Sequence, residues 1–299
     1  MRIFVTGATG FIGSAVVDEL ARAGHHVTGL ARSDAGAESL ERKGVAVHRG
    51  DLEDHASIRR GAATAEAVVH LGFIHDFTRF AEVCANDAAV IRALGDELAG
   101  SQRPLLVASG AALPAGGGIV TEDSRTDYER NPIPRKLTEQ TIDQLANAGL
   151  RAGALRFPPT THGAGDHGFI AMVIDAARKA GASAYVGDGA NRWPACHRLD
   201  AAAMVRLAIE SPFAPGARFH AIAEEGVPFR AIAEAIGHKL ELPTVSKTGD
   251  AAAAHFGWFL HFAGIDVVAS SAKTRAALGW APVQPGLLAD IAASYKAFR

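Results

Sequence analysis

The feature that most constrains the fold of this chain is a glycine-spaced turn near residue 10. Positions 6–13 read Thr-Gly-Ala-Thr-Gly-Phe-Ile-Gly; a short apolar run precedes them and an amphipathic segment over 14–23 follows. This order predicts a strand, a tight turn and a helix. Gly7 permits the turn, Gly10 lets phosphate groups approach the backbone, and Gly13 lets the helix pack closely on the strand. Because free N–H groups at the helix start would face an anion, we predict a dinucleotide-binding turn. A glycine-rich turn that binds nothing is the alternative, which the agreement of strand, turn and helix disfavours.

Apolar and amphipathic segments alternate through residues 1–157, a pattern typical of a parallel sheet with helices on both faces. The predicted strands are short and apolar, as strands buried on both faces should be. These strands cover 2–6, 26–31, 45–49, 67–70, 104–108 and 151–157, and the helices cover 14–23, 36–43, 55–62, 86–98 and 137–148. We therefore expect an α/β fold with a doubly wound parallel sheet of the Rossmann type.

The alternation becomes irregular after residue 157. We expect 158–299 to form mainly a smaller substrate-binding lobe, with parts that return to the dinucleotide-binding core of 1–157. Helices are predicted at 168–180, 201–209, 229–236, 251–262 and 274–278, and strands at 183–186 and 218–222. A long loop over 113–134 should lie on the ligand side of the sheet, and it contains Pro114, Gly116, Gly117 and Gly118.

Composition excludes several classes of protein. The net charge is −2, so no basic surplus indicates nucleic acid or an anionic membrane as a partner. No apolar run approaches the roughly eighteen residues of a membrane span. Cys84 and Cys196 lie far apart, which favours a reducing, cytoplasmic setting over a disulfide framework. The 13 histidines are scattered, and their spacing indicates no metal site. The expected partner is a small-molecule substrate, and a homodimer is one option for an oligomeric state that the sequence leaves open.

The glycine spacing, Gly-x-x-Gly-x-x-Gly, differs from the Gly-x-Gly-x-x-Gly of many dehydrogenases. In this the chain resembles the extended and atypical branches of the short-chain dehydrogenase/reductase superfamily, which include the NAD-dependent epimerases and dehydratases. Residues 6–13 closely match the motif of the extended branch, and the resemblance covers most of the chain. We expect Thr9, Phe11 and Ile12 to contact the cofactor together with the three glycines.

Residues just past the strand ends are further cofactor candidates, because ligands bind at the carboxyl edge of such sheets. Arg32 and Ser33 follow the second strand, where an acid would favour NAD; these side chains instead suit the 2′-phosphate of NADP. We therefore expect NADP, with NAD the less favoured cofactor, although Arg32 as a solvated surface charge is the alternative. The resemblance assigns adenine contact to Asp51 and Leu52, although Asp51 is also placed to cap a helix.

The resemblance also implies contacts on the nicotinamide side of the cofactor. The backbone of Leu71 and Gly72 is expected to pack there, after His70, for which we favour a structural role. The segment Leu155-Arg156-Phe157-Pro158 is similar to a family segment after the next strand, and we expect Pro158 to contact the cofactor.

The expected catalytic centre departs from the family pattern. The resemblance implies a catalytic Ser or Thr near Ser109 and a Tyr-x-x-x-Lys pair before the next long helix. Such a tyrosine exchanges a proton with the substrate oxygen, while the lysine lowers the tyrosine pKa and holds the ribose. No Tyr-x-x-x-Lys occurs here: Asn131 takes the tyrosine position and Arg135 the lysine position. Asn131 cannot act as an acid, whereas Arg135 or Lys136 can still hold the ribose. Tyr128 is the only tyrosine nearby.

A substitute acid would have to come from loops on the ligand side of the sheet. Tyr128, His75, Asp76 and His162 all lie on such loops, although a packing or surface role is the better interpretation of each one. A one-residue offset in the alignment would also place Gly110, rather than Ser109, at the serine position.

Three functions fit these residues, in the following order. The first is an NADP-dependent oxidoreductase that acts on a small carbonyl, alcohol or conjugated substrate. The second is a non-catalytic NADP-binding sensor or regulator, which the missing tyrosine favours. The third is a nucleotide-sugar epimerase or dehydratase, which the extended branch suggests, yet that chemistry ordinarily needs the same tyrosine.

Overall fold

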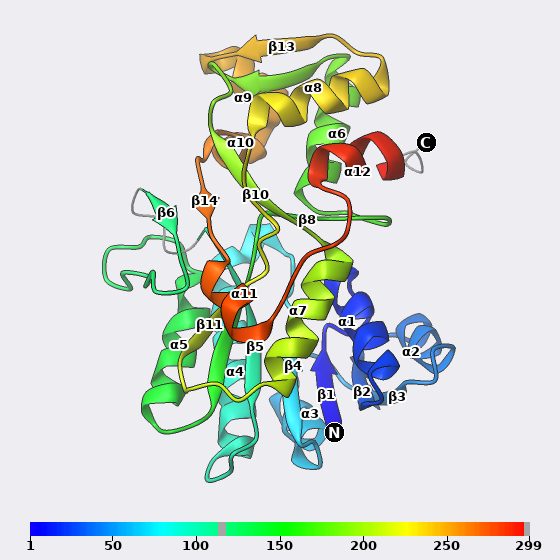
Figure 1. The fold of residues 1–299 in the computed structure, drawn as a ribbon, viewed down its shortest axis with the longest axis vertical. Coiled ribbons are helices and arrows are strands. Elements are labelled where there is room, and N and C mark those ends of the chain that lie inside the picture. The colour runs from blue at the N-terminus through cyan, green and yellow to red at the C-terminus, as the bar shows by residue number, and fades with distance from the viewer. Residues whose placement is uncertain (113–117, 296–299) are drawn as a thin grey trace.

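The computed structural model describes residues 1–112 and 118–295, which form one large sheet and a second group of elements (Figure 1). The large sheet is parallel, with its strands in the order β11-β7-β5-β4-β1-β2-β3. These strands are β1 (Arg2–Thr6), β2 (His26–Ala31), β3 (Ala46–Arg49), β4 (Ala67–His70), β5 (Leu105–Gly110), β7 (Ala152–Phe157) and β11 (Ala217–His220). The chain builds β2 and β3 on one side of β1 and the later strands on the other. The sheet is therefore doubly wound, as predicted, and its order reverses between β1 and β4.

Side chains on β1 alternate between two apolar layers. Ile3 and Val5 point into the layer covered by α1, α2 and α7, whereas Phe4 points into the layer covered by α3, α4 and α5. Because both faces are buried, the strands are nearly continuous apolar runs. The covering helices are α1 (Phe11–Arg22), α2 (Asp34–Glu41), α3 (His55–Ala63), α4 (Phe80–Leu98), α5 (Lys136–Asn147) and α7 (Arg198–Glu210).

The second group of elements lies at the top of Figure 1 and has its own apolar core around the fully buried Trp193. Its small sheets have the orders β12-β10-β8 and β13-β9, and β14 pairs with β6. The strands are β6 (Ile119–Val120), β8 (Thr160–His162), β9 (Ser183–Val186), β10 (Arg192–His197), β12 (Glu224–Pro228), β13 (Thr244–Lys247) and β14 (Val268–Ala269). The helices of this group are α6 (Phe169–Ala180), α8 (Phe229–Leu240), α9 (Gly249–Phe256), η2 (Gly257–Phe259), α10 (Leu260–Gly264) and α12 (Leu287–Ser294). Two further helices lie with the large sheet (Figure 1): η1 (Phe77–Arg79) precedes α4, and α11 (Ala272–Leu278) contacts β11 and α7.

Most predicted elements are present, with small shifts at their ends. The helix predicted over 86–98 begins earlier, at Phe80, because Asp76 accepts the Thr78 N–H and starts a 3-10 turn that leads into α4. The single helix predicted over 251–262 is wrong. Gly257, with φ of +55°, ends α9, and η2 and α10 follow as separate turns.

The strand predicted at 218–222 is β11, which joins the large sheet beside β7 and so returns the chain to the core. Of the glycine-rich run predicted at 114–118, only Gly118 falls within the described residues. None of the helices in the two described ranges is long and apolar enough to cross a membrane.

Candidate cofactor and active site

The glycine turn joins β1 to the first turn of α1. Gly7 has φ of +66°, and a Cβ added there would lie 2.6 Å from the backbone nitrogen of Gly72. A Cβ added to Gly13 would lie 1.9 Å from the carbonyl oxygen of Gly7, so neither position accommodates a side chain. A Cβ added to Gly10 would have one close non-neighbouring atom among the described residues, the Gly7 carbonyl oxygen, at 3.2 Å. The space beside Gly10 is therefore open to an approaching phosphate.

The start of α1 presents N–H groups without a protein cap. Gly10 is the N-cap residue and has no side chain with which to cap the helix N–H groups, and the first turn carries no acid. Thr9 is exposed, while Phe11 and Ile12 are half-buried. The first N–H groups of a helix have no partner within the helix, and the helix dipole adds positive potential there. This arrangement fits the diphosphate of a dinucleotide.

The residues after β2 and β3 lie close together at one side of the turn. The Arg32 side chain is 76% exposed, and its Nε lies 3.6 Å from Asp51 Oδ2. The Ser33 hydroxyl oxygen accepts the Gly36 N–H at the start of α2, over 3.2 Å. Arg49 Nη1 donates to the Ser33 carbonyl oxygen, over 2.6 Å. The Arg49 guanidinium therefore lies against Ser33 and also pairs with Asp34.

Asp51 does not cap α3. Its Oδ1 accepts the Glu53 N–H, over 2.9 Å, whereas Asp54 caps the helix by accepting the Ser57 N–H, also over 2.9 Å. The capping alternative for Asp51 is therefore wrong, because the helix begins one residue after Asp54. The Asp51 carboxylate faces Arg32 instead.

Leu52, Leu71 and Gly72 meet behind the glycine turn. The Gly72 N–H donates to Thr6 Oγ1 over 3.1 Å, and a Cβ added to Gly72 would lie 3.1 Å from both Leu52 methyl groups. The turn at Gly7 packs directly on the Leu71–Gly72 peptide. Buried residue Pro158 immediately follows the end of β7.

His70 belongs to a buried network at the end of β4. Its Nδ1 lies 2.6 Å from Thr6 Oγ1 and its Nε2 lies 3.2 Å from Asp87 Oδ1. Asp87 Oδ2 also accepts hydrogen bonds from Arg135, over 2.5 Å, and from Thr138, over 2.7 Å. Burial opposes the charge on Asp87, but Arg135 and His70 outweigh burial and lower the Asp87 pKa to about 2. This geometry gives His70 a structural role.

Ser109, near the end of β5, belongs to a second buried network. Its hydroxyl donates to Glu139 Oε1 over 2.8 Å. Glu139 has no exposed surface, and Arg156 of β7 donates to both of its oxygens over 2.7 Å each. Burial opposes the charge on Glu139, but Arg156 holds the Glu139 pKa below its usual range. The Ser109 proton is therefore already bound by a carboxylate.

Arg135, at the position of the family lysine, lies between the ends of β4 and β5. Its Nη1 donates to Asp87 and Thr138, over 2.5 and 2.7 Å, and its Nη2 donates to the Ala108 carbonyl oxygen, over 3.2 Å. Its guanidinium covers the Phe73 ring, 4.0 Å from the ring centroid. The Arg135 side chain is 17% exposed, so it is a fixed cation at the carboxyl edge of the sheet.

The loop before α5 directs Tyr128 away from Arg135. The Tyr128 hydroxyl donates to Asp143 Oδ2 over 2.6 Å, and burial together with this carboxylate raises the Tyr128 pKa. Asn131 Oδ1 accepts the Ile133 N–H over 2.9 Å. Lys136 Nζ donates to the carbonyl oxygens of Tyr128 and Asn131, over 2.6 and 2.7 Å. Lys136 therefore ties this loop together.

The fold and the glycine turn match a known family. The model of the NAD dependent epimerase/dehydratase family matches residues 3–221, which include the turn, the large sheet and its covering helices. The chain belongs to the NAD-dependent epimerase/dehydratase family.

Individual relatives agree with this family membership. Uncharacterized protein C2A9.02 of Schizosaccharomyces pombe is 46% identical over 98% of both chains. A 2-alkyl-3-oxoalkanoate reductase of Stenotrophomonas maltophilia is 30% identical over 73% of this chain and 67% of that protein. The structure of MoeE5 in complex with UDP-glucose and NAD has a TM-score of 0.76 at 22% identity, covering 98% of this chain and 97% of that one. At that identity the structural likeness shows the fold.

Within the family, this chain offers poor substitutes for the missing tyrosine acid. Burial, aided by Arg135 and His167, lowers the pKa of His75, so His75 is neutral at pH 7. Asp76 bonds to Thr78 and Arg79, which lower its pKa to about 2, so Asp76 is an anion at pH 7. Neither group is poised to donate a proton at neutral pH.

His162, the remaining candidate acid, is buried away from solvent. Its exposed fraction is 1%, and its Nδ1 lies 2.8 Å from Asp290 Oδ2 on α12. The neighbouring His197 ring packs against it edge-on, with 5.4 Å between ring centroids. This side chain therefore joins β8 to α12, which is a packing role.

Aromatic side chains extend from the end of β4 to the second group of elements. Phe77 is 38% exposed and Trp258 is 60% exposed, and their ring centroids lie 5.3 Å apart. Phe80 stacks on Phe77, and Phe73 contacts Phe80 while supporting Arg135. This exposed aromatic surface beside the Arg135 cation could contact a flat or apolar group of a ligand.

Sequence reasoning missed two residues that shape this site. Asp87 lies inside α4 with no motif around it, and its role follows only from its contacts with His70 and Arg135. Arg198 comes from α7, far from the glycine turn in sequence, yet it contacts Phe11 and Ser14 of α1. Neither carries a local signal that the sequence alone would reveal.

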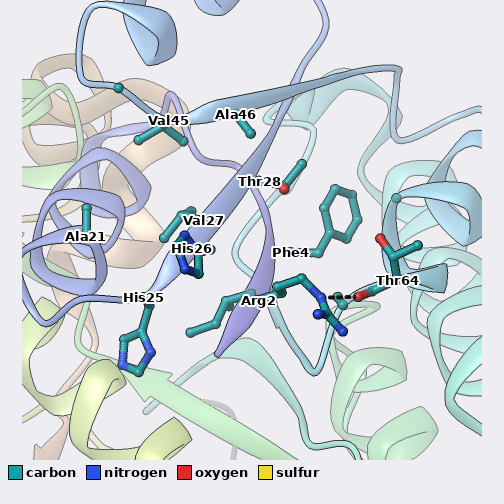
Figure 2. A pocket seen from close by; sticks show the side chains of 14 residues that line it. Arg2, Phe4, Ala21, His25, His26, Val27, Thr28, Val45, Ala46 and Thr64 are labelled. Atoms are coloured by element: carbon teal, nitrogen blue, oxygen red, sulfur yellow. Dashed lines mark hydrogen bonds between the residues drawn. The ribbon is translucent and has the colours of Figure 1, made fainter.

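A cavity of about 230 Å³ lies at the opposite edge of the large sheet (Figure 2). Its lining includes Arg2, His26 and Thr28, from the amino ends of β1 and β2, and Arg2 Nε donates to the Thr64 carbonyl oxygen over 3.0 Å. Because the cofactor candidates follow the carboxyl ends of the strands, this cavity is separate from the candidate site.

Proposed function

We propose that the protein is an NADP-dependent oxidoreductase acting on a small carbonyl or alcohol, or on a conjugated substrate. The observation that carries the proposal is an uncapped helix start beside open space at Gly10. This combination suits a diphosphate, and an NAD(P) cofactor is typical of the family. The Stenotrophomonas relative is a reductase and a Stigmatella aurantiaca relative is a ketoreductase, which supports carbonyl reduction.

The preference for NADP rests on the groups around Ser33. Arg32, Ser33 and Arg49 would hold the 2′-phosphate, while Asp51 and Leu52 would contact the adenine. Because Arg32 is largely exposed, exchanging its contact with Asp51 for a phosphate costs little. Two guanidinium groups give charge-assisted hydrogen bonds that the 2′-hydroxyl of NAD would not match.

The chemistry in this proposal depends on Arg135. The reduced nicotinamide, when bound, supplies a hydride to the substrate carbon. The protein must then stabilise the negative charge that develops on the substrate oxygen, and Arg135 is the fixed cation at that edge of the sheet. Three of the five guanidinium N–H donors bind Asp87, Thr138 and Ala108, which leaves two for a substrate oxygen.

The remaining candidate catalytic residues have smaller roles in this scheme. Asn131 stands at the tyrosine position but cannot act as an acid, and Ser109 would accept a hydrogen bond from an alcohol hydroxyl through its lone pairs. Water supplies the proton, because the Tyr128 hydroxyl is bound to Asp143. A proton taken from water makes the rate lower than in enzymes with a tyrosine acid.

The second candidate function is a non-catalytic NADP sensor. It is favoured by the engagement of Ser109 and Tyr128 with Glu139 and Asp143, which leaves neither hydroxyl as a proton donor. Nucleotide-sugar epimerisation or dehydration ranks third. The MoeE5 complex supports that fold relationship, but Asn131 stands at the tyrosine position on which that chemistry ordinarily depends.

The test is cofactor binding followed by turnover with the purified protein. We expect saturable NADPH binding, tighter than NADH binding, and NADPH oxidation with aliphatic, aromatic and α,β-unsaturated carbonyls, confirmed by identification of the product. Binding without turnover across that panel would favour the sensor. Absence of binding at millimolar NADPH and NADH would refute both functions. Light scattering of the same sample tests whether the protein is a homodimer.

A further inference from the structure

Arg198 reaches the glycine turn from a distant part of the chain. It is the first residue of α7, and its Nη2 donates to Ser14 Oγ in the first turns of α1, over 2.9 Å. Its Nη1 donates to the Ala164 carbonyl oxygen over 3.0 Å. Its guanidinium covers the Phe11 ring, 4.6 Å from the ring centroid. The side chain is therefore fixed over the residue that opens α1.

Arg198 lacks a carboxylate partner. Within the described ranges, no Asp or Glu oxygen forms an ion pair with it, and its buried Nε has no hydrogen-bond partner. The acid that acts on it electrostatically is Asp18, whose carboxylate lies 2.7 Å from Lys43 Nζ. A half-buried cation without a counter-ion is costly, which points to an anion supplied from outside the chain.

Arg206 on the same helix shows the ordinary arrangement. It also links α7 to α1, but its guanidinium pairs with Glu19 over 2.8 Å and with Glu210 over 2.7 Å. Both arginines join α7 to α1, and Arg206 does so with carboxylate partners. Joining the two helices therefore does not explain why Arg198 has no carboxylate partner. The difference lies in position: Arg198 stands at the uncapped start of α1, where the protein provides no acid.

We propose that Arg198 binds the diphosphate of the dinucleotide, opposite the N–H groups of Phe11 and Ile12. The guanidinium and the helix start would hold the diphosphate between them. This inference rests on the proposed dinucleotide binding. It goes beyond that proposal because it assigns a positive partner of the diphosphate, Arg198, to α7 rather than to the glycine turn. The residue would act on NADPH and NADH alike, since both carry the same diphosphate.

The test measures dissociation constants of four ligands for the wild-type protein, Arg198→Gln and Arg198→Lys. NADPH, NADH and ADP-ribose carry the diphosphate, whereas 2′-AMP carries a phosphate only at the position assigned to Arg32. We expect Arg198→Gln to weaken the three diphosphate ligands about ten- to hundredfold, as the loss of a charged hydrogen bond should, and to leave 2′-AMP binding unchanged. Arg198→Lys should restore part of the loss, because it restores the charge without the planar fork.

Arg206→Gln is the matched control, since it removes an α7–α1 contact of the same residue type. It should leave all four dissociation constants unchanged. Equal weakening of 2′-AMP by Arg198→Gln, or equal effects of Arg198→Gln and Arg206→Gln, would overturn the proposal in favour of a purely structural role. Unchanged NADPH binding in Arg198→Gln would overturn it as well. If the wild-type protein binds none of the diphosphate ligands, the proposed function fails first.

Discussion

The two halves of the candidate site treat polar groups in opposite ways. At the glycine turn, the start of α1 has no cap, and Arg198 above it has no carboxylate partner in the described part of the chain. At the ends of β5 and α5, Ser109 is bound to Glu139 and Arg135 is bound to Asp87. In the first half the helix start and Arg198 have no acidic partner among the described residues, whereas in the second half protein groups bind Ser109 and three of the Arg135 donors.

This contrast gives the two halves of the candidate site different expected roles in binding and catalysis. An uncapped helix start beside the Arg198 cation favours an anionic ligand. The hydrogen bonds of Ser109 and Arg135 to buried carboxylates hold both side chains in place, but they leave few groups that could exchange a proton with a substrate. We call the networks of Ser109 and Arg135 the closed half, and the glycine turn with Arg198 the open half. We predict that substitutions in the closed half lower stability, whereas substitutions in the open half lower cofactor affinity.

The largest expected effect is on the closed half. Arg156→Met should lower the free energy of unfolding by about 3–5 kcal/mol, because it removes the bidentate partner of the buried Glu139 carboxylate and leaves Ser109 and the more distant Arg218. Urea unfolding of both proteins measures the change. Adding Glu139→Leu to this variant should recover part of the loss, since it removes the unpaired charge. A loss below about 1 kcal/mol would show that the network is not closed as described.

The next effect is on the open half. Gly13→Ala should weaken NADPH binding by about a hundredfold, because its Cβ would overlap the Gly7 carbonyl oxygen and displace the turn. Calorimetric titration measures the affinity. Gly24→Asn is the control: Gly24 has φ of +84° with no atom within 4 Å of an added Cβ, and asparagine tolerates that conformation. Equal affinity of Gly13→Ala and wild-type protein would contradict the assigned turn.

The free energy of unfolding should depend on pH through Asp87, which belongs to the closed half. The pKa of Asp87 falls from its ordinary value of 3.8 to about 2 in the folded protein. Its contribution to stability is therefore complete above about pH 4 and is lost as the pH falls toward 2, by about 2 kcal/mol. Urea unfolding from pH 7 to pH 2.5 should show a steeper decline for wild-type protein than for Asp87→Asn. Parallel curves would remove Asp87 from the network.

The smallest expected effect is on cofactor choice. Arg32→Asp should lower the ratio of NADPH to NADH affinity by about tenfold, since it replaces a phosphate partner by a like charge. Arg42→Asp is the control, because Arg42 lies on the surface near Glu38, with 3.9 Å between the charged atoms, and beyond the end of α2. An unchanged ratio in Arg32→Asp would leave Arg32 as a solvated surface charge.

Local patterns account for what was predictable. Most strands and helices of 1–157 were found because buried parallel strands and amphipathic helices have different periods, whereas β6 and η1 were not predicted. The turn at Gly7 was found because its residues are adjacent in sequence. The short strands β8, β10 and β12 were missed, because each pairs with a segment distant in sequence and has no hydrophobic repeat of its own.

The candidate site was predictable only in part for the same reason. Asn131 and Arg135 were identified as departures from a motif, but the sequence did not reveal that Tyr128 would turn toward Asp143. Asp87 and Arg198 had no local signal at all, because their roles depend on partners brought close by the packing of α4 and α7.

By itself, the sequence determined the doubly wound sheet and the place of its glycine turn, since both depend on neighbouring residues and short periods. Only the tertiary structure decided which polar groups are already satisfied and which lack a partner. That distinction belongs to contacts between α1 and α7 and between β5, β7 and α5, which the chain forms only when folded. The energetic effect of a buried charge depends on the groups around it, and here those groups are distant in sequence.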